Sequence, residues 1–388
     1  MWIPAVFDLA LKALKARLGG RYTGFLLPLV ACGLLDGAGA QIVPRLNFYS
    51  SYTDNLFQTF ERRSDWITQV YLDLDYVQSE DVNLYYSGNA NVFNEFVDLF
   101  SHAHQLGLSY LKANEDNDVF YAGSEVAMRL DRPLYDYRDF VRARAFANAK
   151  LYVRPTLLSR MGYTLRYQEY VNARDFSFVE QVGFVQLSKF LPSRMTLQAR
   201  GELGLKNYLR DRELDDAFLE SGRQGAVLQW VGQAKVAQSL TEAAGLQLSY
   251  TSRRNLTGQS RRVDEDFYDS DDELFDDRYS YESDEWRTVL KYLAPQGAEL
   301  EVAAGWARRH YSGRPALDLE GNFIGTDVDR RDERRSLSLG LARTFYVEQG
   351  RVRELDVQLD WTYRNTDSND PYYSASGQVF SSGIQIGF

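Results

Sequence analysis

Residues 194–210 read RMTLQARGELGLKNYLR, and polar and apolar side chains alternate along most of this stretch. Alternation with a period of two places one set of side chains on each face of a β-strand. The stretch therefore predicts a strand with one apolar face and one charged face. The apolar set is Met195, Leu197, Ala199, Leu203 and Leu205, and the polar set is Thr196, Gln198, Arg200, Glu202, Lys206 and Arg210.

The same pattern recurs from Arg45 to the last residue, with turn residues between the alternating stretches. Sixteen such stretches predict sixteen strands. Two of them, 176–189 and 284–294, alternate poorly, so counts from 14 to 18 are compatible with the pattern. The other stretches are 45–53, 65–77, 81–94, 102–113, 117–130, 137–153, 159–171, 194–210, 224–239, 244–254, 298–311, 335–347, 352–364 and 377–388.

The composition excludes a helical membrane protein and leaves room for a membrane barrel. The mean hydropathy is −0.41, and no stretch after residue 40 approaches the roughly 18 to 20 apolar residues of a spanning helix. A barrel strand turns only every second residue to lipid, which dilutes its apolar content. The aromatic share of 14% suits membrane interfaces, where amphipathic rings gather. A large soluble all-β protein is the alternative.

The connections favour the barrel over a soluble sandwich. Short connections such as 240–243 alternate with long ones such as 211–223, 255–283, 312–332 and 365–376. Outer-membrane barrels have short periplasmic turns and longer extracellular loops. The fold class predicted is therefore all-β, a transmembrane antiparallel barrel of about 16 strands.

The last stretch resembles the C-terminal signal that the outer-membrane barrel-assembly machinery recognises. Its apolar residues occupy one face and end in a terminal aromatic residue. The resemblance implies that this machinery is a partner and that the final strand closes the barrel. The signal residues are Phe380, Ile384, Ile386 and Phe388.

Residues 1–40 have the features of an export segment, which leaves 41–388 as the barrel domain. Basic residues precede an apolar core at 25–35, and Ala38-Gly39-Ala40 forms a cleavage site before Gln41. Leu29-Val30-Ala31-Cys32 also matches a lipobox, so lipidation at Cys32 is the alternative to cleavage after Ala40. Either route exports the chain, and the expected location is the bacterial outer membrane.

The net charge of −10 excludes the basic footprint of a nucleic-acid-binding protein. Nothing in the sequence predicts a cofactor or a metal. The histidine pair His102 and His104 has no third ligand in view, and His310 stands alone. No motif pairs a nucleophile with a base, so an outer-membrane lipase or protease is the least favoured reading, and we expect no enzyme.

The charged faces of several strands predict a basic wall inside the barrel, because a lumen this wide holds water unless loops fill it. Rings of Arg and Lys in a pore favour anionic solutes. The alternative is that these cations are solvated and paired with acids such as Glu202, Glu301, Asp356 and Asp360. The candidate pore-lining residues are Arg142, Arg144, Lys150, Arg166, Arg200, Glu202, Lys206, Arg210, Arg309, Asp356 and Asp360.

The connection 255–283 is strongly acidic and is expected to be a solvated surface loop. Twelve acids lie between Arg261 and Glu285. No glycine interrupts this acidic run to form the tight turn of a calcium loop, so a specific calcium site is disfavoured. Divalent ions bridging this loop to lipopolysaccharide remain an alternative, and outer-membrane lipid is an expected partner.

The stretch Ser51-Tyr52-Thr53-Asp54-Asn55-Leu56-Phe57, followed by Ser64-Asp65-Trp66-Ile67, resembles the start of a proteobacterial barrel family often encoded with exopolysaccharide genes. The specific match covers about 25 residues. We expect Asp54 and Asn55 to form side-chain turns where the first hairpin reverses. The resemblance implies a porin-like channel for polar or anionic solutes, including passage of an anionic polysaccharide. The alternative is a non-conducting binding or scaffolding barrel.

Overall fold

The computed structural model describes residues 41–210, 225–260, 277–326, 328–347, 352 and 354–387. The expected export segment 1–40, with Cys32, lies outside the described residues, as do Phe388 and most of the acidic connection.

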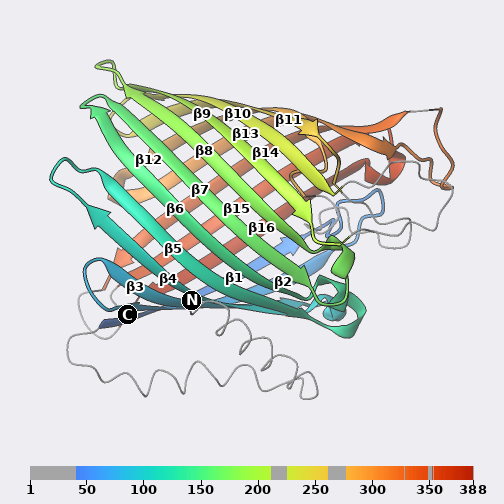
Figure 1. Ribbon diagram of the computed structural model, residues 1–388, viewed down its shortest axis with the longest axis horizontal. Helices are drawn as coiled ribbons and strands as arrows, with labels where there is room; N and C mark the ends of the chain where they lie inside the picture. Colours follow the sequence, from blue (N-terminus) through green and yellow to red (C-terminus); the bar gives the residue numbers. More distant parts are fainter. Residues whose placement is uncertain are drawn as a thin grey trace. The chain divides into compact units, whose positions relative to one another are not determined.

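Sixteen antiparallel strands form a closed barrel in which each strand pairs with its neighbours in the sequence, and β1 pairs with β16 (Figure 1). The fold class and the count of sixteen are confirmed. The strands are β1 Gln41–Thr53, β2 Asp65–Val77, β3 Val82–Phe93, β4 Ser101–Ala113, β5 Val119–Asp131, β6 Phe140–Arg154, β7 Leu157–Tyr170, β8 Phe178–Phe190, β9 Met195–Tyr208, β10 Ala226–Ser239, β11 Ala244–Thr257, β12 Glu282–Leu293, β13 Ala298–Pro315, β14 Asp329–Tyr346, β15 Glu354–Ser368 and β16 Ala375–Gly387.

The wall closes where β16 runs antiparallel to β1, from Arg45 opposite Gly387 to Thr53 opposite Val379. The Oγ atoms of Ser51 and Ser381 lie 2.9 Å apart across this seam. Closure pairs the facing edges of the first and last strands over these residues, so that neither edge is left open to lipid there. The expected pairing of the final strand with the first is confirmed.

The two poorly alternating stretches are strands β8 and β12. The inward-facing positions of β8 include Phe178, Val182 and Phe184, while Gln181 and Gly183 face outward. The polarity of the two faces is therefore locally mixed, which weakened the sequence pattern without ending the strand.

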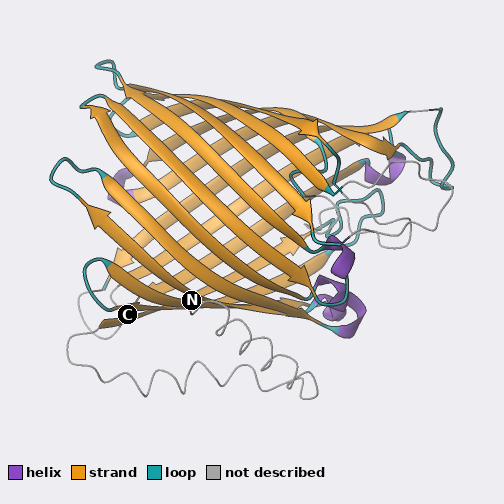
Figure 2. Ribbon diagram, viewed as in Figure 1, coloured by secondary structure: helices purple, strands orange, loops and turns teal. Residues whose placement is uncertain are grey.

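Short connections lie at one end of the barrel and longer ones at the other, as the sequence predicted. We call these the periplasmic and extracellular ends, following the general arrangement of outer-membrane barrels. Most of the short helices lie at the extracellular end, and one lies at a periplasmic turn (Figure 2). The 3-10 helices are η3 Val97–Leu99, η4 Pro133–Arg138, η5 Arg174–Phe176, η6 Pro295–Gly297 and η7 Pro371–Tyr373.

The outer surface of the wall is apolar. Leu203, Trp230 and Leu339 are 48%, 42% and 45% exposed, and the polar residues that precede them, Glu202, Gln229 and Ser338, face inward. Burying such a side chain is worth about 1.5 to 3 kcal/mol, so a water-soluble protein does not leave whole rows of them uncovered. Among the described residues, no helix is long and apolar enough to span a membrane. The chain is a membrane-spanning barrel of the outer-membrane type.

Candidate functional site: the lumen and its inward loop

The inward-facing positions carry polar and charged side chains, and most predicted pore-lining residues are among them. Pairing in register assigns faces, because directly opposite residues share a face. Arg210 is the exception: it follows the end of β9 and lies 4.0 Å from Glu169, an outward-facing residue of β7. The residues that the strand pairing assigns to the inward face are Arg142, Arg144, Lys150, Arg166, Arg200, Glu202, Lys206, Arg309, Asp356 and Asp360.

Acids from adjacent strands neutralise much of the expected basic wall. Arg144 lies 3.3 Å from Glu125 on β5, and Arg166 lies 2.8 Å from Glu180 on β8. These partners face each other in the strand register. Glu125 and Glu180 were missed from the sequence because register between strands was not known. The basic wall is a wall of ion pairs over part of its extent.

Aromatic rings in the lumen hold several of the same cations. The guanidinium of Arg200 lies 3.9 Å from the ring centre of Phe184, and that of Arg166 lies 5.0 Å from Phe178. Arg200 also donates a 2.6 Å hydrogen bond to Glu202. A cation over an aromatic face gains about 0.5 to 2 kcal/mol, depending on how far it is desolvated. The rings therefore restrict these side chains and leave less freedom to follow a passing solute.

Part of the connection between β11 and β12 lies on the inner wall. Asp277 accepts a hydrogen bond from Lys206, and Arg278 donates to Glu202; both partners face inward from β9. The hydroxyl of Tyr279 donates to Glu180. Because all three partners face inward, residues 277–279 occupy space inside the barrel. The expectation that this connection is a solvated surface loop is wrong for these residues.

The inward segment is buried, and its charges are matched. Tyr279 is 1% exposed and Lys206 is 3% exposed. Burial opposes ionisation of Asp277, but the Lys206 ammonium holds the pKa of this carboxyl below its usual range. Burial, followed by the Glu180 carboxylate, raises the pKa of the Tyr279 hydroxyl, which stays a hydrogen-bond donor. Each buried charge of the network therefore has a partner of opposite charge or a hydrogen-bond donor inside the barrel.

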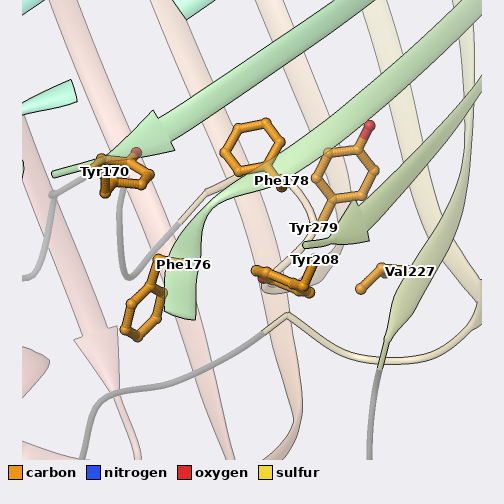
Figure 3. Close-up of a cluster of buried hydrophobic side chains, with 6 residues drawn as sticks. All are labelled: Tyr170, Phe176, Phe178, Tyr208, Val227 and Tyr279. Carbon is orange, nitrogen blue, oxygen red and sulfur yellow. The ribbon is translucent and has the colours of Figure 1, made fainter. Parts of the chain in front are cut away.

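A small hydrophobic cluster supports the segment at the extracellular end (Figure 3). Tyr279 packs with side chains from the ends of β7, β8, β9 and β10, and Gly204 makes room for it. A Cβ at Gly204 would lie 2.5 Å from the Tyr279 hydroxyl oxygen. The cluster is Tyr170, Phe176, Phe178, Tyr208, Val227 and Tyr279.

Inward-facing charges of the periplasmic half that form no ion pair with another described residue are segregated, whereas Arg45 and Lys291 pair with acids. Lys150, Arg160 and Lys235 face inward on β6, β7 and β10 and form no ion pair within the described ranges. Asp73 faces inward on β2, and Asp356 and Asp360 face inward on β15. In the strand order, β2 and β10 are eight strands apart in either direction, as are β7 and β15. Cations and carboxylates therefore face one another across the lumen.

Asp54 and Asn55, expected to form local turns, also bind the opposite side of the seam. Oδ1 of Asp54 accepts a 2.7 Å hydrogen bond from the backbone N–H of Gln378. The Asn55 amide donates to the carbonyl oxygens of Thr59 at 2.8 Å and Ser376 at 3.2 Å. Local turn chemistry was therefore only part of their role, because Gln378 and Ser376 belong to β16.

Asp65 anchors a neighbouring loop. Its buried carboxylate accepts hydrogen bonds from the backbone N–H groups of Trp66, Asn94, Glu95 and Phe96, at 2.6 to 3.1 Å. Nothing local in the sequence pointed to this role, since three of these donors lie about thirty positions away. Both parts of the motif that carries the family resemblance therefore have structural roles: Asp54 and Asn55 bind β16, and Asp65 holds the loop after β3.

The remaining predicted residues lie on the outer face. Phe380, Ile384 and Ile386 face outward on β16. His102 and His104 are outward-facing on β4, with their ring nitrogens 3.1 Å apart, and His310 lies 3.3 Å from Asp329. No group of three or more His, Cys, Asp or Glu residues in the described part of the chain is placed to hold a metal ion.

Comparison with known proteins yields barrels of low sequence identity. No family model matches the chain, and no curated protein matches it. The solved structure of OprD from Pseudomonas aeruginosa is 9% identical over 90% of this chain and 95% of its own, with a TM-score of 0.47. OccD3 (OpdP) of the same species is 11% identical over 90% and 94%, with a TM-score of 0.49. A structure described as a bacterial polysaccharide outer membrane secretin is 10% identical over 89% and 98%, with a TM-score of 0.49. Likeness at this level transfers no substrate, so the fold rests on the strand pairing of this chain.

Proposed function

We propose that this protein is a passive, porin-like channel for polar solutes across the outer membrane. The observation that carries the proposal is the inner face of the barrel, which presents charged and hydrogen-bonding side chains from all around the wall. A barrel of sixteen strands is wide enough to enclose an aqueous path. The inward segment 277–279 would then narrow that path near its extracellular end.

Conductance in planar lipid bilayers tests this proposal. Purified protein should produce discrete current steps. Silence from the wild-type protein and also from a Tyr279→Ala variant, which removes the large inward ring, would contradict a channel. Both proteins should first migrate on gels as folded, heat-modifiable barrels, so that silence is not confused with unfolding.

We further propose a preference for anionic solutes. Lys150, Arg160 and Lys235 have longer side chains than the aspartates across from them, so their charges reach further towards the lumen axis. The triple variant K150Q/R160Q/K235Q should shift the reversal potential in a salt gradient towards cation preference. The triple variant D73N/D356N/D360N should shift it the opposite way. A cation-selective wild-type channel would refute the preference.

Passage of an anionic polysaccharide is the finer proposal, and the family resemblance of residues 51–76 supports it. Deleting the gene should reduce polysaccharide at the cell surface, and a plasmid copy should restore it. Unchanged surface polysaccharide in the deletion strain would count against this cargo while leaving the channel intact.

The buried network of the inward segment also favours a second candidate, a barrel whose lumen is closed and whose loops bind a partner. Its contacts fill inner space in the extracellular half of β8 to β10. The conductance experiment distinguishes the two candidates, because a closed scaffold stays silent.

A further inference from the structure

Several arginines face outward near the extracellular ends of adjacent strands. Arg308 lies on β13, Arg331 and Arg335 lie on β14, and each is on the same face as the apolar rows. Strands β1 to β10 differ from β13 and β14 in this respect. The extracellular halves of β1 to β10 carry no outward-facing arginine or lysine within the described ranges. We call Arg308, Arg331 and Arg335 the arginine patch.

The arginine patch lies at the edge of the apolar surface. Along β13, outward-facing Leu300 and Val302 are 41% and 40% exposed, and Trp306 and Arg308 follow on the same face. Arg308 is ten residues beyond the start of β13. Ten residues at about 3.3 Å each, tilted by about 40°, advance about 25 Å, which is the height of the apolar band of such barrels. The patch therefore lies at the level of the outer headgroups.

The carboxylates nearby compensate the arginine patch only in part. Glu333 lies 2.6 Å from Arg335 and 3.8 Å from Arg308, and Asp367 lies 3.9 Å from Arg335, so two carboxylates lie within ion-pair distance of the three-arginine patch. The Arg308 and Arg335 side chains are 70% and 60% exposed. The indole N–H of Trp306 donates to Glu333 at 3.1 Å and so fixes the acid between them. Exposed ion pairs of this kind are worth about 0 to 1 kcal/mol, so another anion can displace them.

We propose that the arginine patch binds the phosphate groups of lipopolysaccharide in the outer leaflet. The planar guanidinium fork matches phosphate oxygens, and Trp306 supplies the amphipathic ring that suits the interface. Leu337 and Leu339, directly below Arg335 on the outward face of β14, would contact the acyl chains. This inference is independent of whether the lumen conducts.

Binding of purified diphosphoryl lipid A to the detergent-solubilised barrel tests the proposal. The variant R308Q/R331Q/R335Q should bind about tenfold more weakly than the wild-type protein. The matched control, K112Q/K189Q/R343Q, removes three outward-facing cations nearer the periplasmic end and should change binding by less than about twofold. Dephosphorylated lipid A should lose affinity for the wild-type protein to a similar extent.

The proposal fails if the patch variant binds like the wild-type protein or if the control loses as much affinity. It also fails if phosphatidylglycerol competes as well as lipid A, because the surface would then be a general anionic-lipid site. If the triple variant does not fold, the single variants R308Q and R331Q replace it. Each should weaken binding about threefold, and unchanged affinity in both overturns the proposal.

Discussion

The hydroxyl of Tyr279 donates a 2.7 Å hydrogen bond to Oε1 of Glu180, a residue 99 positions earlier in the chain. Glu180 also receives the guanidinium of Arg166 at 2.8 Å. One carboxylate on β8 therefore joins a neighbouring strand and an extracellular connection. Leaving such a group buried without its donor costs about 1 to 3 kcal/mol, so the contact holds the segment against the wall.

Replacing Tyr279 with alanine should increase single-channel conductance. The change removes a large side chain from the lumen, and the strand pairing of the wall does not involve it. Tyr292→Ala, which alters a 41% exposed tyrosine on the outer face of β12, is the control and should leave conductance unchanged. Equal conductance of Tyr279→Ala and wild type would show that the segment does not narrow the path.

Gly204→Ala should destabilise the barrel by about 1 to 3 kcal/mol, because the new Cβ displaces the Tyr279 hydroxyl and breaks its bond to Glu180. Gly201→Ala is the matched control on the same strand, since a Cβ there meets nothing within 4 Å. Denaturant unfolding in lipid vesicles measures both changes. A smaller effect at Gly204 than at Gly201 would contradict the close contact between Gly204 and Tyr279.

Asp65→Ala should loosen the loop that contains η3 by leaving several backbone N–H groups without their acceptor. We expect a loss of about 2 kcal/mol and faster proteolysis within residues 94–100. Asp98→Ala changes an exposed carboxylate in the same loop and serves as the control. Equal protection of the loop in the Asp65 variant and the wild-type protein would rule out the anchoring role.

Asp139 should make stability depend on pH. Burial, together with the nearby Asp131 and Asp136 carboxylates, raises the pKa of Asp139 to about 7, although the Asp131 N–H bond opposes this. Because the folded protein holds this proton more tightly, the contribution is full below about pH 4 and falls as the pH rises to 7. Asp139→Asn should remove up to about 1.4 kcal/mol per pH unit of this slope. Thermal unfolding at pH 4, 5.5 and 7 measures it. An identical slope in the variant would refute the assignment, and Asp98→Asn is the control.

The strands were predictable because one face of each meets lipid, and period-two alternation records that fact directly. This holds for β9, where Arg200, Glu202 and Lys206 share the face opposite the leucines. The alternation is weaker in β8, where Phe178 faces the lumen and packs in the cluster with Tyr279. Local patterning therefore predicts the wall well wherever no loop packs against it from inside.

The candidate site was predictable only in part, because its contacts depend on register and on a loop path. Glu125 and Glu180 neutralise inward-facing arginines because the strand register places them opposite Arg144 and Arg166. Alternation along one strand does not determine the register between two strands. Asp277 was counted among solvated acids, yet it meets Lys206 inside the barrel. A run of acidic residues in the sequence indicates a local negative charge, but it does not indicate where the chain turns into the barrel.

The hydrogen bonds of the Asp54 and Asn55 side chains reach residues 324 and 321 positions further along the chain. Contacts between such distant segments are slow to form, because the intervening chain must be ordered first. One edge of β1 therefore has no hydrogen-bonding partner until β16 has been synthesised and pairs with it. A truncated chain without β16 would lack the partners of Asp54 and Asn55 and could not close the barrel.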